Sequence, residues 1–315
     1  MNEGIEKTVK LSPEDNVVVA LSELTAENIL DDTGLHPRET IPSGHKVAVS
    51  RINNGEPIIK YGQIIGLAAK DILPGMHVHT HNTKMLELTR DYAIGADVRP
   101  VSIRPESKQA HFQGFIRSNG QVGTRNYIGI LATVSCSASV ARFIADAITP
   151  EILAQYPQVD GVVALGHGSG CCSPAGGEGL ELLQRCLAGY ARNPNFGGIV
   201  FVGLGCEVNH LDCLLEIMNL EKGSRLKTVN IQNAGGTTKT VRRGVEAVQD
   251  MLPEVNRIKR CSVSAAHIML GLECGGSDGY SGISANPALG KAVDILVQNG
   301  GTAILSETPE IYGAE

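Results

Sequence analysis

Positive charge is not in excess in this sequence, and long apolar runs are absent from it. The 315 residues include 27 Lys and Arg against 33 Asp and Glu, which gives a formal net charge of −6. This charge balance lacks the excess of positive charge that is typical of nucleic-acid-binding proteins, so a nucleic-acid partner is not expected. No apolar run approaches the roughly 20 residues that span a bilayer, so a membrane partner is not expected either.

The sequence also lacks a secretion signal and the spacings of common cofactor motifs. Its first residues, MNEGIEKTVKLSPEDN, are charged and have no apolar core, which predicts a cytoplasmic location. The sequence contains no C-x₂-C pair of the zinc-finger type and no G-x-x-x-x-G-K-[ST] nucleotide loop. No G-x-G-x-x-G opens a helix after the first strand of the larger domain, which disfavours a nicotinamide-dependent oxidoreductase.

Cysteine and glycine are plentiful instead. The chain has eight cysteines and 37 glycines. In the cytoplasm the thiols are expected to stay reduced, so each is a buried small residue, a metal ligand or a reactive thiol. Glycine at about 12%, against a usual level of about 7%, indicates many tight loops in which the backbone approaches a neighbour closely.

Two patterns divide the chain. Residues 8–82 hold short β-branched runs broken by Gly and Pro, which predicts a small β-rich domain. Residues 83–111 resemble a linker with a short helix at 84–92. From 112 to 315, apolar runs alternate with amphipathic stretches, which predicts a doubly wound, mostly parallel α/β domain. The expected strands are 127–134, 161–166, 198–205, 226–231, 266–272 and 301–306, and the expected helices lie within 137–153, 178–191, 211–221 and 237–252.

The carboxyl ends of four expected strands carry a cysteine. Because these ends share one edge of a parallel sheet, where ligands bind, the four thiols are expected to converge. Thiolate, imidazole and carboxylate groups together suit iron first and zinc second, or an Fe–S cluster. The alternative is that the thiols are small packing residues, as is expected for Cys186, Cys213 and Cys261. The candidate metal ligands are Cys136, His167, Cys171, Cys206 and Cys274, with Glu207 and Glu273 beside two of them.

Two further stretches predict ligand binding. The glycine-rich loop at 274–282 can present backbone N–H groups to an anion, which makes Gly275, Gly276 and Ser277 candidate substrate-binding residues. In MHVHTHN, a strand would place His77, His79 and His81 on one face, about 6.6 Å apart from one to the next. His45 and Asn82 are expected to join the same pocket. The alternative is a solvent-facing edge strand.

These motifs resemble one enzyme family. GHKVAVSRINNGEPIIKYGQIIG with HVHTHN resembles the small SAF-type (β-clip) domain of altronate/galactarate dehydratases. NGQVGTRNYIGILATVSC, HGSGCC, VGLGCEVNH and GLECGGSDGYSGISANPALG resemble the main domain, with the altronate branch the nearer of the two. The resemblance, together with an ending that finishes a strand and begins a loop, predicts that the chain is the front part of a longer polypeptide.

The resemblance implies a hydro-lyase that converts D-altronate to 2-dehydro-3-deoxy-D-gluconate and water. It implies ferrous iron, with manganese(II) or an Fe–S cluster as alternatives, and a homodimer is a further expectation. The alternatives are a galactarate dehydratase or a non-catalytic protein that binds a metal or a sugar acid. The implied base is one of His45, His79, His81, Glu207 and Glu273. Lys46 and Arg125 are expected to pair with the substrate carboxylate, unless they only solvate the surface.

Overall fold

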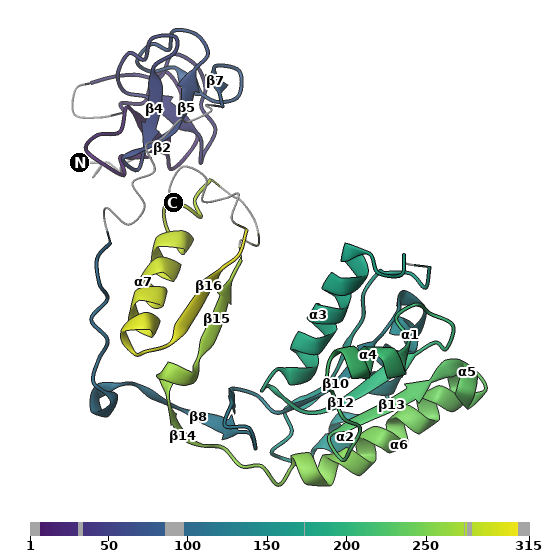
Figure 1. Ribbon diagram of the computed structural model, residues 1–315. Coiled ribbons are helices and arrows are strands. Elements are labelled where there is room, and N and C mark those ends of the chain that lie inside the picture. Colours follow the sequence, from purple (N-terminus) through teal and green to yellow (C-terminus); the bar gives the residue numbers. More distant parts are fainter. Residues whose placement is uncertain are drawn as a thin grey trace. The chain divides into compact units, whose positions relative to one another are not determined.

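The computed structural model describes residues 7–30, 34–85, 98–172, 174–273, 275 and 279–307. The chain folds into two compact units (Figure 1). One consists of Met1–Ile103, Met269–Gln298 and Thr302–Glu315, and the other of Arg104–Ile268 and Asn299–Gly301. Most of the helix expected at 84–92 lies outside the described residues. The expected domain limits of 8–82, 83–111 and 112–315 stay predictions.

The N-terminal part of the first unit is built from short strands, and the expected β-rich domain is confirmed. One antiparallel sheet has the order β1-β2-β3-β6 and a second has the order β4-β5-β7. Buried Val, Ile, Leu and Ala side chains form two clusters, one that includes residues of both sheets and one beside β2 and β3. The strands are β1 (Thr8–Val9), β2 (Val17–Ala20), β3 (Lys46–Ala48), β4 (Pro57–Lys60), β5 (Gln63–Ala68), β6 (His77–Val78) and β7 (Thr83–Lys84).

The second unit contains the predicted parallel sheet. Its order is β11-β10-β12-β13, and each neighbouring pair runs parallel. The first strand along the chain, β10, therefore lies inside the sheet with later strands on both sides. The strands are β10 (Tyr127–Ala132), β11 (Gly161–Leu165), β12 (Phe196–Gly203) and β13 (Leu226–Asn230), all within the expected apolar runs except the start of β12.

Helices cover both faces of this sheet, so the doubly wound arrangement is confirmed (Figure 1). On one face, α1 and α6 pack on Ile128, Ile130 and Val200. On the other, α3 and α4 pack on Leu131 and Phe201. The helices are α1 (Ser135–Asp146), α2 (Pro150–Leu153), α3 (Glu178–Arg192), α4 (Leu211–Ile217), α5 (Ile231–Ala234) and α6 (Thr237–Val255).

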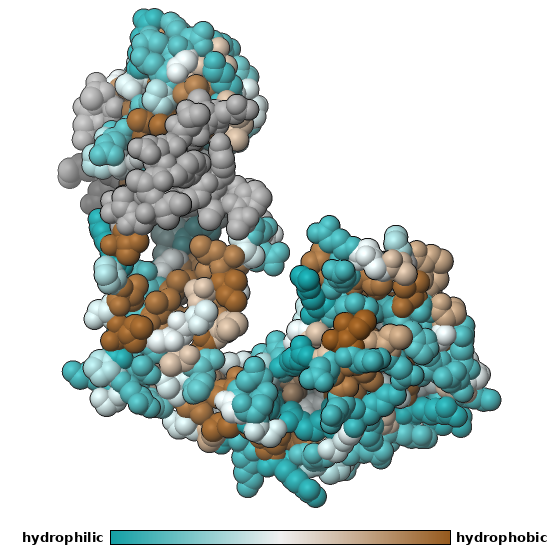
Figure 2. All heavy atoms as spheres, in the orientation of Figure 1, coloured by the Kyte–Doolittle hydropathy of each residue, from teal (hydrophilic) through white to brown (hydrophobic). Residues whose placement is uncertain are grey.

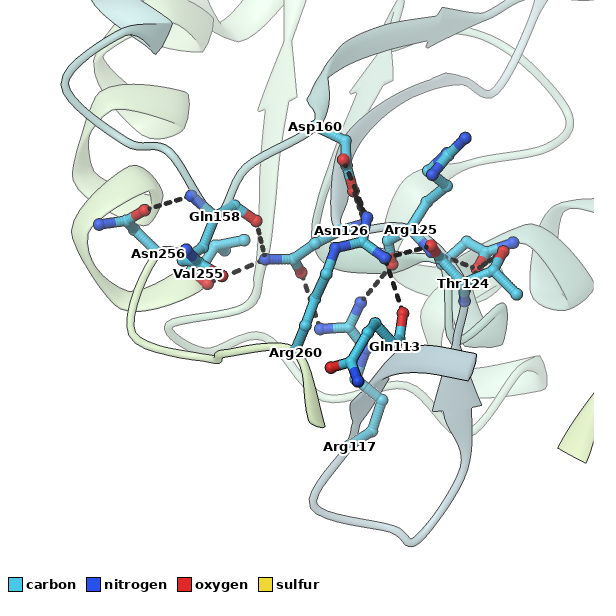
Figure 3. Close-up of polar contacts among 11 residues, drawn as sticks. Gln113, Arg117, Thr124, Arg125, Asn126, Gln158, Asp160, Val255, Asn256 and Arg260 are labelled. Atoms are coloured by element: carbon cyan, nitrogen blue, oxygen red, sulfur yellow. Dashed lines mark hydrogen bonds and ion pairs between the residues drawn. The ribbon is translucent and has the colours of Figure 1, made fainter. Parts of the chain in front are cut away.

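A small antiparallel sheet lies at the amino ends of the parallel strands. It has the order β14-β8-β9 and is formed by β8 (His111–Ile116), β9 (Val122–Gly123) and β14 (Cys261–Ser264). A polar network centred on Asn126 joins this region to the parallel sheet (Figure 3). The Asn126 amide is fully buried and donates to the carbonyls of Gln158 and Val255, at 2.8 and 3.0 Å.

The last two expected strands do not join the parallel sheet. Among the described residues, β15 (Met269–Leu272) and β16 (Thr302–Leu305) pair only with each other, in parallel, and α7 (Ala285–Gln298) contacts β16. Apolar side chains remain exposed on these elements, as the brown patch over them in Figure 2 shows. The remaining short helices are η1 (Glu106–Lys108) and η2 (Ala265–His267). In the described part of the chain no helix is both long and apolar enough to cross a membrane.

Candidate functional site

Four histidines of the first unit form a cluster, as the sequence predicts. The Nδ1 atom of His45 lies 2.9 Å from the Nε2 atom of His77. The ring of His79 stacks on both, with centroids 5.0 Å from His45 and 5.3 Å from His77. The ring centroid of His81 lies 5.4 Å from that of His77. Strand β6 is the edge strand of its sheet, and His79 and His81 are exposed, as the alternative of a solvent-facing edge strand expects.

The cluster is assembled by a turn rather than by a continuous strand. Strand β6 ends at Val78, and a turn follows it. The fully buried side chain of Asn82 closes this turn, because its Nδ2 donates to the carbonyl of His77 at 2.7 Å and its Oδ1 accepts from the amide of His79 at 2.9 Å. Asn82, expected to bind substrate, is thus placed where it fixes the loop that carries the imidazoles.

The surroundings keep two of the imidazoles neutral. Burial, followed by the neighbouring His79 and Lys46, lowers the pKa of His45. Burial lowers the pKa of His77 most, and the neighbouring His45, His79 and His81 lower it further. Glu39 acts in the opposite direction. Burial, with Lys60 second, also lowers the pKa of Lys46. A pocket of about 230 Å³ opens here, lined by Ser43, Gly44, His45, Lys46, His79 and Gly279. It offers an amine and two imidazoles to a small ligand.

A second group of expected site residues lies in the other unit, at the carboxyl ends of β10 and β12. Its centre is Glu207, whose side chain is buried. One carboxylate oxygen accepts from Thr133 Oγ1 at 2.9 Å and from the Leu204 amide at 3.0 Å, and the other accepts from the Gly205 amide at 2.5 Å. Burial alone would raise the pKa of Glu207, but these hydrogen bonds together lower it. The carboxylate therefore holds the loop after β12.

The expected metal ligands at this edge are distributed over three loops. Cys136 is exposed in the first turn of α1, Cys206 is exposed after β12, and Cys171 is half-buried after β11. The Cys171 Sγ lies 3.7 Å from the Sγ of the exposed Cys172. His167 is near the carbonyl of Ala132 through Nε2, at 3.2 Å, and its Nδ1 accepts from the Ser169 amide at 3.2 Å.

Both ring nitrogens of His167 are thus engaged by the backbone, and a metal would have to displace one of these partners. Over the described ranges, no three or more His, Cys, Asp and Glu side chains form a group that could hold a metal ion. Cys274, Gly276 and Ser277 lie outside the described residues. Glu273 and Gly275 are described, and both follow β15 in the first unit.

Two expectations about individual residues need correction or relocation. Cys186 and Cys213, expected to pack inside helices, are exposed, because they fall on the solvent side of α3 and α4. Arg125 precedes β10 and so lies at the amino ends of the parallel strands. The loops with Cys136 and Cys206 are about six strand residues away, roughly 20 Å. Binding of a carboxylate by Arg125 stays a prediction, but it cannot act at those loops.

Sequence reasoning missed the residues that hold these loops in place. Thr133 and Asn209 are buried, and the Asn209 amide donates to the carbonyl of Thr133 at 3.1 Å. Glu39 accepts from the His77 amide at 3.0 Å. The available signal was a polar residue directly after a buried strand, which Thr133 is after β10.

Comparison with known proteins places each region in one family. Residues 6–86 match the model described as altronate/galactarate dehydratase SAF domain, and residues 114–256 match D-galactarate dehydratase/altronate hydrolase, second domain. Residues 265–315 match D-galactarate/altronate dehydratase, C-terminal.

Three curated relatives cover nearly the whole chain. Altronate dehydratase of Bacillus subtilis is 34% identical over 313 residues, which are 98% of this chain and 61% of the relative. Altronate dehydratase of Escherichia coli is 35% identical over 310 residues, 98% of this chain and 61% of the relative. Galactarate dehydratase (L-threo-forming) of Escherichia coli is 32% identical over 315 residues, 97% of this chain and 60% of the relative. The chain thus spans about three-fifths of the length of these relatives.

Proposed function

Because the chain belongs to the altronate/galactarate dehydratase family, we propose that it acts as a sugar-acid dehydratase. D-altronate is the first proposed substrate, and 2-dehydro-3-deoxy-D-gluconate and water are the products. Galactarate is the second candidate, because a galactarate dehydratase is 32% identical to the chain. The cytoplasmic location and the homodimer expected from the sequence stay predictions.

The observation that supports this proposal most is the four-histidine cluster beside Lys46. Dehydration of a sugar acid needs a base for the C2 proton and an acid for the departing C3 hydroxyl. A neutral imidazole is an effective base near pH 7, and the lowered pKa values of His45 and His77 keep these rings neutral there. The half-buried Lys46 in the same pocket is suited to the substrate carboxylate.

The proton transfers follow from these positions. Lys46 holds the carboxylate, and His45 or His79, which line the pocket, takes the C2 proton. The resulting imidazolium, or its hydrogen-bonded neighbour His77, returns a proton to the C3 hydroxyl, which leaves as water. A C2–C3 double bond forms, and the enol then tautomerises to the 2-keto-3-deoxy acid. Proton and oxygen both balance without an added oxidant or reductant.

Glu207 is a weaker candidate for the base. Its oxygens already accept three hydrogen bonds, and its pKa is lowered, so it binds a proton less readily than an ordinary carboxylate. We propose that the imidazoles perform the proton transfer and that Glu207 positions its loop.

Ferrous iron stays a proposal, with manganese(II) or an Fe–S cluster as alternatives. Imidazole donors are gathered in the four-histidine cluster and thiols are present at the sheet edge, but within the residues described no set of three is placed to hold a metal. The proton transfers above therefore use only side chains of the chain. Metal analysis after anaerobic loading with Fe²⁺ tests the proposal directly, and Cys206→Ser tests whether that thiol contributes.

The experiment that tests the proposed function is an anaerobic assay with added Fe²⁺. Formation of the 2-keto-3-deoxy acid is followed from D-altronate and from galactarate, with the Bacillus subtilis relative as positive control. We expect turnover of D-altronate by the wild-type chain and a loss of roughly 100-fold or more in His45→Gln, as for removal of a general base. His36→Gln, an exposed histidine of the same unit, is the matched control.

The results distinguish the three candidate functions: altronate dehydratase, galactarate dehydratase and a non-catalytic binding protein. Turnover of galactarate but not altronate would favour the second substrate. Binding of altronate by calorimetry without turnover would favour the non-catalytic alternative. Absence of both binding and turnover, with an active control, would reject the proposed function.

A further inference from the structure

A pocket at the amino edge of the parallel sheet gathers three arginines. Its volume is about 370 Å³, within the range of small-molecule sites. Arg117 comes from the β8–β9 turn, Arg192 from the last residue of α3 and Arg225 from the residue before β13. None of the described residues that line it is Asp or Glu; its other polar side chains are Ser118, Asn119, Gln121 and Asn193.

Neutral acceptors hold these guanidinium groups in place. Arg117 is only 5% exposed, and it donates to the carbonyls of Pro194 and Arg125 and to Asn126 Oδ1, at 2.7, 3.1 and 2.8 Å (Figure 3). Arg125 accepts from Arg117 through its backbone carbonyl, and its own side chain points away from this network (Figure 3). A guanidinium has five N–H groups, so Arg117 has donors beyond these three bonds.

The other two arginines are fixed in the same way. Arg225 donates from Nε to the Gly197 carbonyl at 2.7 Å and from Nη2 to the Phe196 carbonyl at 3.4 Å. Arg192 donates from Nη2 to the carbonyl of Met218. All of these acceptors are uncharged, so each guanidinium is oriented without being neutralised.

Among the described residues, no carboxylate forms an ion pair with these three arginines. Asp160 is the acid that acts on Arg117. It already pairs with Arg260 at 3.2 Å and accepts from the backbone N–H of Asn126 at 2.6 Å. Burial, followed by the nearby Arg225, lowers the pKa of Arg117 to about 10, and Asp160 opposes both effects. Like charges held together at a partly buried site favour an anion among them.

We propose that this three-arginine pocket binds a small phosphate-bearing anion. A phosphate group carries between one and two negative charges near pH 7 and offers three acceptor oxygens, which suits three guanidinium groups better than one carboxylate does. The pocket is separate from the loops at 133–136 and 203–209. Strand β12, eight residues long and therefore about 25 Å, runs from one edge to the other.

Calorimetric titration of the full 315-residue chain with inorganic phosphate tests the proposal. Acetate serves as a monoanionic comparison, and a sugar phosphate distinguishes a phosphate ester from free phosphate. Arg192→Gln and Arg225→Gln remove one guanidinium each. Arg243→Gln, on the exposed face of α6, is the matched control. Thermal unfolding of each variant checks that it folds, and Arg117→Lys is kept as a further variant because Arg117 is buried.

We expect phosphate to bind more tightly than acetate, and we expect its affinity to fall with added NaCl. Arg192→Gln and Arg225→Gln should each weaken binding by about tenfold, as for a lost charge-assisted hydrogen bond, while Arg243→Gln binds as the wild type does. A stronger response to the sugar phosphate would identify an ester as the ligand. Three results would overturn the proposal. The two pocket variants could bind phosphate as tightly as the wild type, Arg243→Gln could lose as much affinity as they do, or the wild type could bind no phosphate at all.

Discussion

The Nδ1 atom of His45 lies 2.9 Å from the Nε2 atom of His77, so one imidazole donates a hydrogen bond to the other. His45 precedes β3 and His77 begins β6, and these strands are antiparallel neighbours with Lys46 opposite Val78 and Val47 opposite His77. The strand register therefore sets the distance between the two rings. A proton on one ring repels a proton on the other, which couples their titration.

Burial of the two rings, together with this coupling, makes stability depend on pH. The folded pKa values of His45 and His77 lie below the ordinary value, which is about 6.5. Between the folded and unfolded values the unfolded chain binds more protons, so stability falls as pH drops through about 6.5 toward the folded pKa values. Urea midpoints at about pH 7.5 and 5.5 should differ less in the His45→Gln/His77→Gln variant than in wild type. An unchanged difference, with His36→Gln as control, would contradict this.

Glu207→Gln should destabilise the second unit. The glutamine side chain keeps one acceptor oxygen, but its NH₂ group replaces the other oxygen and faces a backbone N–H. That buried N–H donor then has no acceptor. Such a loss costs about 1–3 kcal/mol of unfolding free energy. Chemical denaturation measures it, and Glu246→Gln on the exposed face of α6 is the control. Equal stability of Glu207→Gln and wild type would show that the carboxylate does not hold the loop.

Two helix glycines should respond to alanine in opposite directions. A Cβ at Gly244 in α6 would lie 2.7 Å from Cγ1 of Ile144 and closer still to its Cδ1, and Ile144 is fully buried in the helix pair. Gly244→Ala should therefore cost about 1–3 kcal/mol through overpacking. Gly189 in α3 has nothing within 4 Å, so Gly189→Ala should add about 0.5–1 kcal/mol through helix propensity. Thermal unfolding compares the two, and a shift of the same sign in both would refute the packing argument.

Asn126→Ala should be among the most damaging single changes in the second unit. The fully buried amide donates to two carbonyls and accepts from Arg117, so alanine leaves several polar groups unpaired in the interior (Figure 3). A loss of at least about 3 kcal/mol is expected. The exposed Asn119→Ala is the control, and urea denaturation by circular dichroism gives both values. A loss below about 1 kcal/mol would mean that water replaces these contacts.

The fold could be predicted where periodicity carries the information. The apolar runs at 127–134, 161–166 and 226–231 each contain a strand of the parallel sheet, because continuous apolar runs between amphipathic stretches have few other solutions. The run at 266–272 has the same character, yet within the described ranges β15 pairs with β16 and not with the parallel sheet. An apolar run predicts a strand but not its partner, since pairing depends on the rest of the fold.

The site could be predicted only where the relevant residues lie near one another in the sequence. His77, His79 and His81 are alternate residues, so the cluster was visible although a turn pinned by Asn82 replaces most of the strand. The three-arginine pocket was not visible, because its arginines lie up to about a hundred residues apart and only the sheet brings them together.

The position of β10 also determines when this unit can fold as it is made. Its neighbours β11 and β12 both follow it along the chain, and the pairing of Ala132 with Val202 joins residues 70 positions apart. On a ribosome that adds residues from the N-terminus, β10 must wait without its inner partner until β12 has emerged. We expect arrest-peptide measurements to detect folding of this unit only after β12 has left the exit tunnel, and a slowed segment between β10 and β12 to increase aggregation of the nascent chain.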